Sequence, residues 1–251
     1  IGVEVAMLLE SLGLEVTVIE RSWVMPNVLD EETAGFVLDV LQSHGVNVRE
    51  HTEAVRFIGS ERVEGVELKS GELVFADACV AATGVKPNVD FLAGSGLDID
   101  WGIRVDSRMR TNLSDIWAAG DVAETVDRIT GKRFVHAIWP NARAQGDIVA
   151  RDMLGYSADY PGAERMNSMK HLGIPLIAVG EATGEQTLRQ RRGKALRKIF
   201  LNDGMIVGFR LAGDTRGAGT YRALMLRGTD VSRFGEDLLD PNFHLDWCLA
   251  A

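Results

Sequence analysis

The stretch IGVEVAMLLESLGLEVTVIER, residues 1–21, decides the fold class. Val3 and Met7 lie one helical turn apart, which predicts an apolar helical face, and Gly13 supplies the helix stop. The β-branched run LEVTVI then predicts a strand that ends before Glu20. A helix followed by a strand is the back half of a βαβ unit, so the sequence predicts an α/β fold whose first strand lies outside it.

Half of a dinucleotide-binding fingerprint fits these residues. Gly2 would be the last glycine of the phosphate-binding turn, and Glu20, 18 positions later, would bind the adenosine ribose. The expected spacing is about 20 residues. A carboxylate at Glu20 favours NAD over NADP, although the neighbouring Arg21 weakens that preference. The alternative is an ordinary helix and strand with a charged loop start.

Composition excludes several classes of protein. The chain has 251 residues, 46% hydrophobic content and a formal net charge of −9, which argues against disorder, nucleic-acid binding and anionic membranes. No apolar run approaches the roughly 20 residues needed to span a bilayer. Cys79 and Cys248 lack paired spacing, so we expect a reducing, cytoplasmic location. The five histidines are scattered, which predicts no metal site.

The hydrophobic pattern divides the chain into three segments, residues 1–85, 86–156 and 157–251. In the first, Asp30 is the expected N-cap of a second helix, and three alternating runs after it predict an antiparallel meander. The remaining expected strands are 46–50, 77–83, 103–105, 115–121, 176–183, 195–202 and 205–213, and the expected helices are 139–155, 219–228 and 232–239. Asn202-Asp203-Gly204 is the expected hairpin turn between the last two strands.

Two further motifs carry a family resemblance. ATGVKPN, residues 82–88, and TNLSDIWAAGDVAE, residues 111–124, occur in the order typical of two-dinucleotide flavoproteins. The chain thereby resembles the FAD-dependent pyridine nucleotide-disulfide oxidoreductases. The resemblance implies a truncated Rossmann-like NAD(P)-binding domain, the second segment of an FAD-binding domain, and a small α+β C-terminal domain. It also implies FAD and NAD as cofactors, with NADP less favoured.

The resemblance assigns residues to the flavin site. Gly120 would admit the cofactor's pyrophosphate, Asp121 would accept a hydrogen bond from the ribityl chain, and the helix from Trp139 would direct its N-terminus at the flavin pyrimidine. A tryptophan packing at a helix start is the alternative. The other implied FAD contacts are Thr83, Gly84, Val122 and Ile138.

Glu4 is the implied catalytic residue. In the family a glutamate on the first helix reaches the junction of flavin and nicotinamide. The alternative is an exposed glutamate favoured by the helix dipole.

Among family members, residues 136–181 most resemble rubredoxin reductases and the flavoprotein part of NADH nitrite reductases. The implied function is hydride transfer from NAD(P)H to FAD and electron transfer to a carrier protein or fused redox domain. An NADH oxidase or coenzyme A disulfide reductase with an N-terminal cysteine is an alternative, as is a non-catalytic cofactor-binding interaction protein. We expect the chain alone to be inactive, to hold FAD poorly, and to be capable of homodimerising through an exposed strand edge.

One segment departs from the acidic average. LRQRRGKALRK, residues 188–198, holds six cations in eleven residues. Arg191 and Arg192 would dock an acidic electron carrier such as a rubredoxin or ferredoxin, since opposite charge raises the encounter rate. The alternative is a solvated loop that leads into a strand.

Overall fold

The helix and the strand predicted within residues 1–21 both form. In the computed structural model, which describes residues 1–169 and 173–246, α1 (Gly2–Ser11) is followed by β1 (Thr17–Ile19). β1 pairs in parallel with β2 (Asn47–Arg49) across α2 (Glu31–Ser43). Asp30 caps α2 as predicted, since its Oδ1 accepts the Thr33 N–H at 3.3 Å. Cys248 lies outside the described residues.

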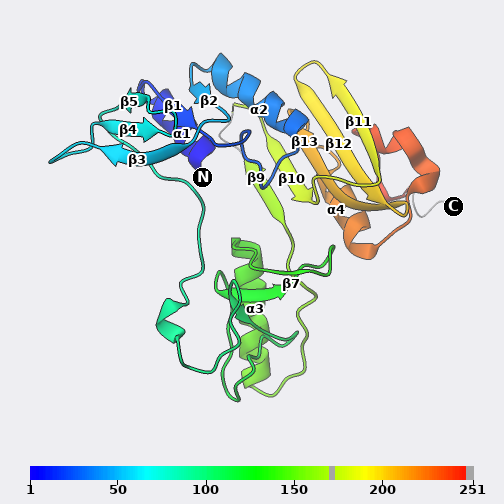
Figure 1. Cartoon of the computed structure of the whole chain (residues 1–251). Helices are drawn as coiled ribbons and strands as arrows, with labels where there is room; N and C mark the ends of the chain where they lie inside the picture. Colours follow the sequence, from blue (N-terminus) through cyan, green and yellow to red (C-terminus); the bar gives the residue numbers. More distant parts are fainter. Residues whose placement is uncertain (170–172, 247–251) are drawn as a thin grey trace. The chain divides into compact units, whose positions relative to one another are not determined.

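The contacts divide the chain into two units, each of which is described by itself (Figure 1). The first unit holds residues 1–83, 167–224 and 228 onward, and the second holds 84–166 with 225–227. The first and third segments of the sequence therefore share one unit. The predicted domain boundaries stay a prediction.

The first unit contains two further sheets. The predicted meander forms a three-stranded antiparallel sheet in the order β3-β4-β5, and the C-terminal part forms a five-stranded sheet in the order β11-β12-β13-β10-β9. The strands are β3 (Ala54–Ile58), β4 (Gly65–Leu68), β5 (Leu73–Phe75), β9 (Met166–Met169), β10 (Leu176–Gly180), β11 (Gln186–Arg192), β12 (Ala195–Asn202) and β13 (Met205–Ala212). The last elements are α4 (Ala218–Arg227) and the 3-10 segment η2 (Ser232–Leu239).

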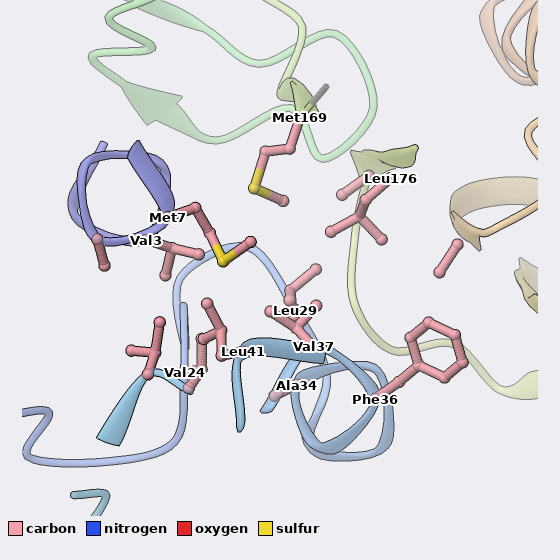
Figure 2. Close-up of a cluster of buried hydrophobic side chains, with 14 of the residues drawn as sticks. Val3, Met7, Val24, Leu29, Ala34, Phe36, Val37, Leu41, Met169 and Leu176 are labelled. Carbon is pink, nitrogen blue, oxygen red and sulfur yellow. The ribbon is translucent and has the colours of Figure 1, made fainter. Parts of the chain in front are cut away.

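One apolar core joins α1, α2 and the five-stranded sheet of the first unit. Figure 2 shows Val3 and Met7 of α1 gathered with Val37 of α2 and with Met169 and Leu176 of the C-terminal sheet. Val37 is fully buried, and burying an aliphatic side chain contributes about 2 kcal/mol. The helices next to the predicted NAD site are thus packed directly on the five-stranded sheet.

The second unit is built from short elements around one helix. Its elements are η1 (Asp90–Leu92), β6 (Ile103–Arg104), β7 (Ala123–Val126), β8 (Arg133–Phe134) and α3 (Trp139–Met153). β6 pairs in parallel with β7, and β7 pairs with β8 in an antiparallel hairpin. The predicted helix from Trp139 is confirmed.

Three sequence predictions of local structure are wrong. Residues 77–83 form no strand: Val80 is 63% exposed, and within the described residues no strand pairs with this segment to satisfy its backbone. Residues 115–121 form only an isolated bridge, Arg110 to Trp117. The cationic stretch 188–198 is no loop, because it lies in β11 and β12 and the short turn between them.

Candidate functional site

Glu20 follows β1 at the carboxyl end of the parallel pair, where open α/β sheets bind ligands. Its backbone N–H donates to Arg49 O at 3.0 Å, and its carbonyl accepts the Thr52 N–H at 2.9 Å, so both sides of the main chain are held. Its carboxylate Oε1 accepts the Ser22 N–H at 3.1 Å. The adjacent Arg21 is exposed. This geometry suits a carboxylate that binds sugar hydroxyls.

Gly2 and Glu4 lie in the first turn of α1. A Cβ at Gly2 would stand 3.1 Å from Ala82 Cβ, so the helix start approaches residues 76–83 too closely for a larger residue without a shift. Glu4 is half-buried, and its carboxylate makes no hydrogen bond or ion pair within residues 1–169 and 173–246. Its carboxylate is therefore available, and its catalytic role stays a prediction.

Thr83 and Gly84 lie where the two units divide. Both are exposed, and neither belongs to a helix or strand. Gly84 has φ +106°, a conformation that side chains other than glycine rarely adopt. Thr83 belongs to the first unit and Gly84 to the second, and their roles at the flavin stay predictions.

The Gly120-Asp121 motif forms a tight turn against α3. Gly120 has φ +82°, and its carbonyl accepts the Ala123 N–H at 3.0 Å. Its own N–H donates to Oε1 of Gln145, a buried side chain of α3, at 2.7 Å. Asp121 is exposed and Val122 is half-buried. Gln145 of α3 thus holds the turn in place. The Asp121 carboxylate has no partner among the described residues.

A buried carboxylate holds the main chain that follows this turn. Glu124 in β7 is 3% exposed, and its Oε2 accepts the N–H groups of Trp101 at 3.1 Å and Gly102 at 3.2 Å. A Cβ at Gly102 would stand 2.6 Å from the Val122 carbonyl oxygen, so glycine is required for this approach. Glu124 and Gly102 together hold the main chain after Asp121.

The N-terminus of α3 is open to a ligand. Ile138 is extended, with φ −136° and ψ 145°, and Pro140 stands in the first turn, where a missing N–H costs nothing. Trp139 is 80% exposed, so the alternative that it packs a helix start is wrong. Asn141 is buried and donates to Glu164 O at 2.9 Å. The positive end of the α3 dipole is therefore held in place, and the first residue of the helix, Trp139, is exposed.

The chain before α3 is held by a buried contact between a histidine and an aspartate. His136 Nε2 lies 2.8 Å from Asp127 Oδ2, and each side chain is 5% exposed. Burial alone would raise the pKa of Asp127, but hydrogen bonds from His136 and from the N–H groups of Thr130 and Ile129 hold that pKa well below its usual value. The His136 carbonyl accepts the Ile138 N–H at 2.9 Å. The pair thereby positions the residue at which α3 begins.

The far end of α3 is tied to the TNLSDIW segment. Asp152 accepts hydrogen bonds from Arg110 Nε at 2.6 Å and Nη2 at 2.8 Å, and from Trp117 Nε1 at 2.8 Å. These bonds, led by the one from Arg110, lower the pKa of Asp152. Both ends of the helix are thus anchored independently of any cofactor.

The two arginines predicted to dock a carrier point to opposite faces of the C-terminal sheet. Because they are successive residues of strand β11, their side chains alternate. Arg191 faces α2, lying 3.9 Å from Asp39 Oδ2 and 5.6 Å from the centre of the Phe36 ring. Arg192 is exposed on the other face and has no ion-pair partner within the described residues. They do not form one continuous patch.

The same hairpin also pairs with the start of α2. Buried Lys198 contacts the carboxylate of Asp30 and lies 3.0 Å from Glu32 Oε2, while Arg189 pairs with Glu32. Four of the six cations counted in the sequence have carboxylate partners within 4.0 Å: Arg189, Arg191, Arg197 and Lys198. The basic stretch is therefore largely neutralised inside its own unit.

Within the second unit, the structure brings part of the predicted flavin site together. Gly120, Asp121 and Val122 lie against α3, whose first residues are Trp139 and its cap Ile138. This cradle fits a phosphate-bearing, hydroxylated group, because it offers a glycine turn, an uncommitted carboxylate and a helix N-terminus. Sequence reasoning missed the residues that hold it: Gln145, Glu124, Asn141, Asp127 and His136.

Two features are absent from the part of the chain that the structure describes. No cluster of three or more His, Cys, Asp or Glu side chains in that part of the chain could hold a metal ion. No described helix has both the length and the apolar character needed to cross a bilayer.

The curated proteins that resemble this chain include two that are named for their use of NADH. Over 241 residues the chain is 31% identical to the epsilon subunit of an NADH-dependent phenylglyoxylate dehydrogenase from Aromatoleum evansii, covering 92% of this chain and 57% of the relative. Over 247 residues it is 29% identical to an NADH oxidase from Methanocaldococcus jannaschii, covering 90% and 55%. The chain therefore spans little more than half the length of these curated relatives.

A solved structure and a family profile complete the comparison. A ferredoxin reductase from Rhodopseudomonas palustris superimposes with a TM-score of 0.87 and 25% identity, over 98% of this chain and 62% of that one. The sequence profile of the pyridine nucleotide-disulphide oxidoreductases matches residues 1–146, more than half of the chain. The chain belongs to the pyridine nucleotide-disulphide oxidoreductase family.

Proposed function

We propose that this chain provides part of the nicotinamide site and the second flavin-binding segment of an FAD-dependent NAD(P)H oxidoreductase. Electrons would pass from NAD(P)H, by way of the flavin, to a carrier protein or a fused redox domain. Bound FAD supplies the conversion between two-electron and one-electron chemistry. The chain's residues bind and orient the cofactors and stabilise charge.

The Gly120 turn is the observation that carries this proposal. With its N–H held by Gln145 at 2.7 Å, the turn presents the exposed Asp121 carboxylate to a sugar-chain hydroxyl. Ile138 and Trp139 open the helix whose positive N-terminus would stabilise negative charge on the flavin pyrimidine. Thr83 and Gly84 would complete the flavin contacts.

The nicotinamide cofactor would use the first unit. Gly2 lets it approach the start of α1, and Glu20 accepts hydrogen bonds from the adenosine ribose. Glu20 disfavours a 2′-phosphate, so NADH is the preferred donor, with Arg21 as the residue that would tolerate NADPH. Glu4, free of competing partners among the described residues, would stand at the hydride-transfer junction.

The names of the relatives support an electron acceptor outside the nucleotide sites. One relative is a subunit of an NADH-dependent dehydrogenase, and one solved structure is a ferredoxin reductase. We therefore propose a small electron-carrier protein or a redox domain as the acceptor.

A second candidate is NADH oxidase activity, which the name of the Methanocaldococcus jannaschii relative favours. The two functions separate in one measurement on the complete protein. Oxygen consumption with NADH alone indicates an oxidase, whereas turnover that requires an added carrier or artificial acceptor indicates a carrier reductase.

The test of the proposal is NADH turnover by the complete, flavin-loaded protein with an artificial acceptor. We expect turnover to fall strongly in Glu4→Gln and flavin retention to fall in Asp121→Ala. Asp237→Ala, at an exposed aspartate whose side chain has no partner among the described residues, serves as the matched control for Asp121. If NADH never reduces the flavin-loaded protein, the oxidoreductase proposal is wrong and the protein binds its cofactors without catalysis.

A further inference from the structure

A small cavity opens on the C-terminal sheet of the first unit. Its volume is about 220 Å³, and its polar lining consists of Gln190, Arg192, Arg197, Asp214 and Arg216. None of these residues belongs to the proposed nucleotide sites. Three guanidinium groups beside one carboxylate are unusual in a chain whose net charge is −9.

Strand register explains why the arginines meet. Gln190 stands opposite Arg197 in the β11–β12 pair, and Arg192 stands opposite Ala195. Residues two apart on a strand, and residues directly opposite each other, share a face of the sheet. Gln190, Arg192 and Arg197 therefore project to the same side, and Arg216 joins them from the segment between β13 and α4.

Arg197 is the buried floor of the cavity. Its side chain is 5% exposed, and its Nη1 donates to Arg216 O at 2.9 Å and to Tyr221 Oη at 2.8 Å. Its Nη2 is buried without a hydrogen-bond partner among the described residues, and its nearest carboxylate oxygen, Asp214 Oδ1, is 4.0 Å away. A buried charged donor without an acceptor is costly, so the charge of Arg197 favours an anion beside it.

The carboxylate in the cavity does not meet that need. Asp214 is engaged by Arg216, whose Nη2 donates to Oδ2 at 2.6 Å and whose Nε donates to Oδ1 at 3.0 Å. These hydrogen bonds lower the pKa of Asp214 to about 2, so it stays ionised. The charge of Asp240 also attracts that of Arg216. The three guanidinium groups of the cavity still outnumber these two carboxylates.

We propose that this cavity binds a small free oxyanion of phosphate size. Arginine forks match the oxygens of phosphate, and the amide of Gln190 offers one more donor. A cavity of about 220 Å³ has room for such a group together with a few waters, each of which takes about 30 Å³. The charge of Arg197 lies beneath the anion, and the exposed side chains of Arg192 and Arg216 lie beside it.

The test is isothermal titration of the chain with inorganic phosphate at constant ionic strength. We expect the dissociation constant to rise at least about tenfold in the double variant Arg192→Gln/Arg216→Gln, which changes exposed side chains and leaves Arg197 intact. Arg62→Gln, an exposed arginine in a loop of the same unit, is the matched control and should stay within about twofold.

Three outcomes would overturn the proposal. They are no phosphate binding to the wild-type chain, an equal loss in the Arg62 control, and displacement of phosphate by sodium chloride as effective as displacement by sodium sulfate. The last would show general screening of charge rather than a site shaped for an oxyanion. Competition by sulfate alone, with the loss confined to the double variant, supports the site.

Discussion

Replacement of Gln145 by methionine tests how the Gly120 turn is held. Methionine keeps the length and volume of the side chain but removes the acceptor for the Gly120 N–H, which lies 2.7 Å from Oε1. Gln145 is 2% exposed, so water does not readily replace it. A buried N–H left without a partner costs about 1–3 kcal/mol, which is about a 5- to 150-fold change in an opening equilibrium.

Amide hydrogen exchange at Gly120 measures this directly. We expect exchange to accelerate by about tenfold or more in Gln145→Met, because local opening becomes less costly. Gln42→Met, at an exposed position of α2, is the matched control and should change stability by less than about 0.5 kcal/mol. If Gly120 exchanges at the same rate in both variants, the hydrogen bond does not hold the turn.

Further predictions concern charge. Asp121→Ala should leave the urea midpoint of the chain unchanged yet reduce flavin retention by the complete protein, since the side chain is exposed. The pKa of Asp127 is lower in the folded state than in the unfolded state, so its ionised form stabilises the fold above about pH 4, and this stabilisation is lost as the pH falls toward the folded-state pKa. Between pH 5 and pH 3, the free energy of unfolding measured in urea should therefore fall less in Asp127→Asn than in wild type. Lys198→Met should destabilise by about 1.5–3 kcal/mol in urea unfolding because it leaves the half-buried Asp30 carboxylate without its cation, whereas the exposed Lys194→Met should not. Arg192→Glu should lower the association rate constant with a ferredoxin and make that rate less dependent on salt, as measured by stopped flow without phosphate. An unchanged rate constant would show that the carrier does not dock through Arg192.

Local patterns predicted the elements whose signals are local. The turn at Asn202-Asp203-Gly204 and the alternation on each side gave the limits of β12 and the start of β13, because hairpin register follows from the turn residues. The capping aspartate, Asp30, gave the start of α2. These predictions needed no knowledge of distant parts of the chain.

Contacts between distant residues were not predictable in this way. Gln145 meets Gly120 across 25 residues and Glu124 meets Gly102 across 22, so neither partner is visible in a local pattern. Residues 77–83 have the composition of a buried strand, but a strand forms only where neighbours pair with its backbone. The placement of Arg191 and Arg192 on opposite faces of β11 was not predictable, because cations in a strand carry no clear periodic signal.

The central claim is that this chain helps to hold a flavin that NAD(P)H reduces. The most direct measurement is an anaerobic titration of the complete, flavin-loaded protein with NADH, followed by flavin absorbance. We predict stoichiometric bleaching of the flavin, with a smaller response to NADPH, and loss of the bound flavin in Asp121→Ala. A flavin that stays oxidised in excess NADH and NADPH would contradict the account.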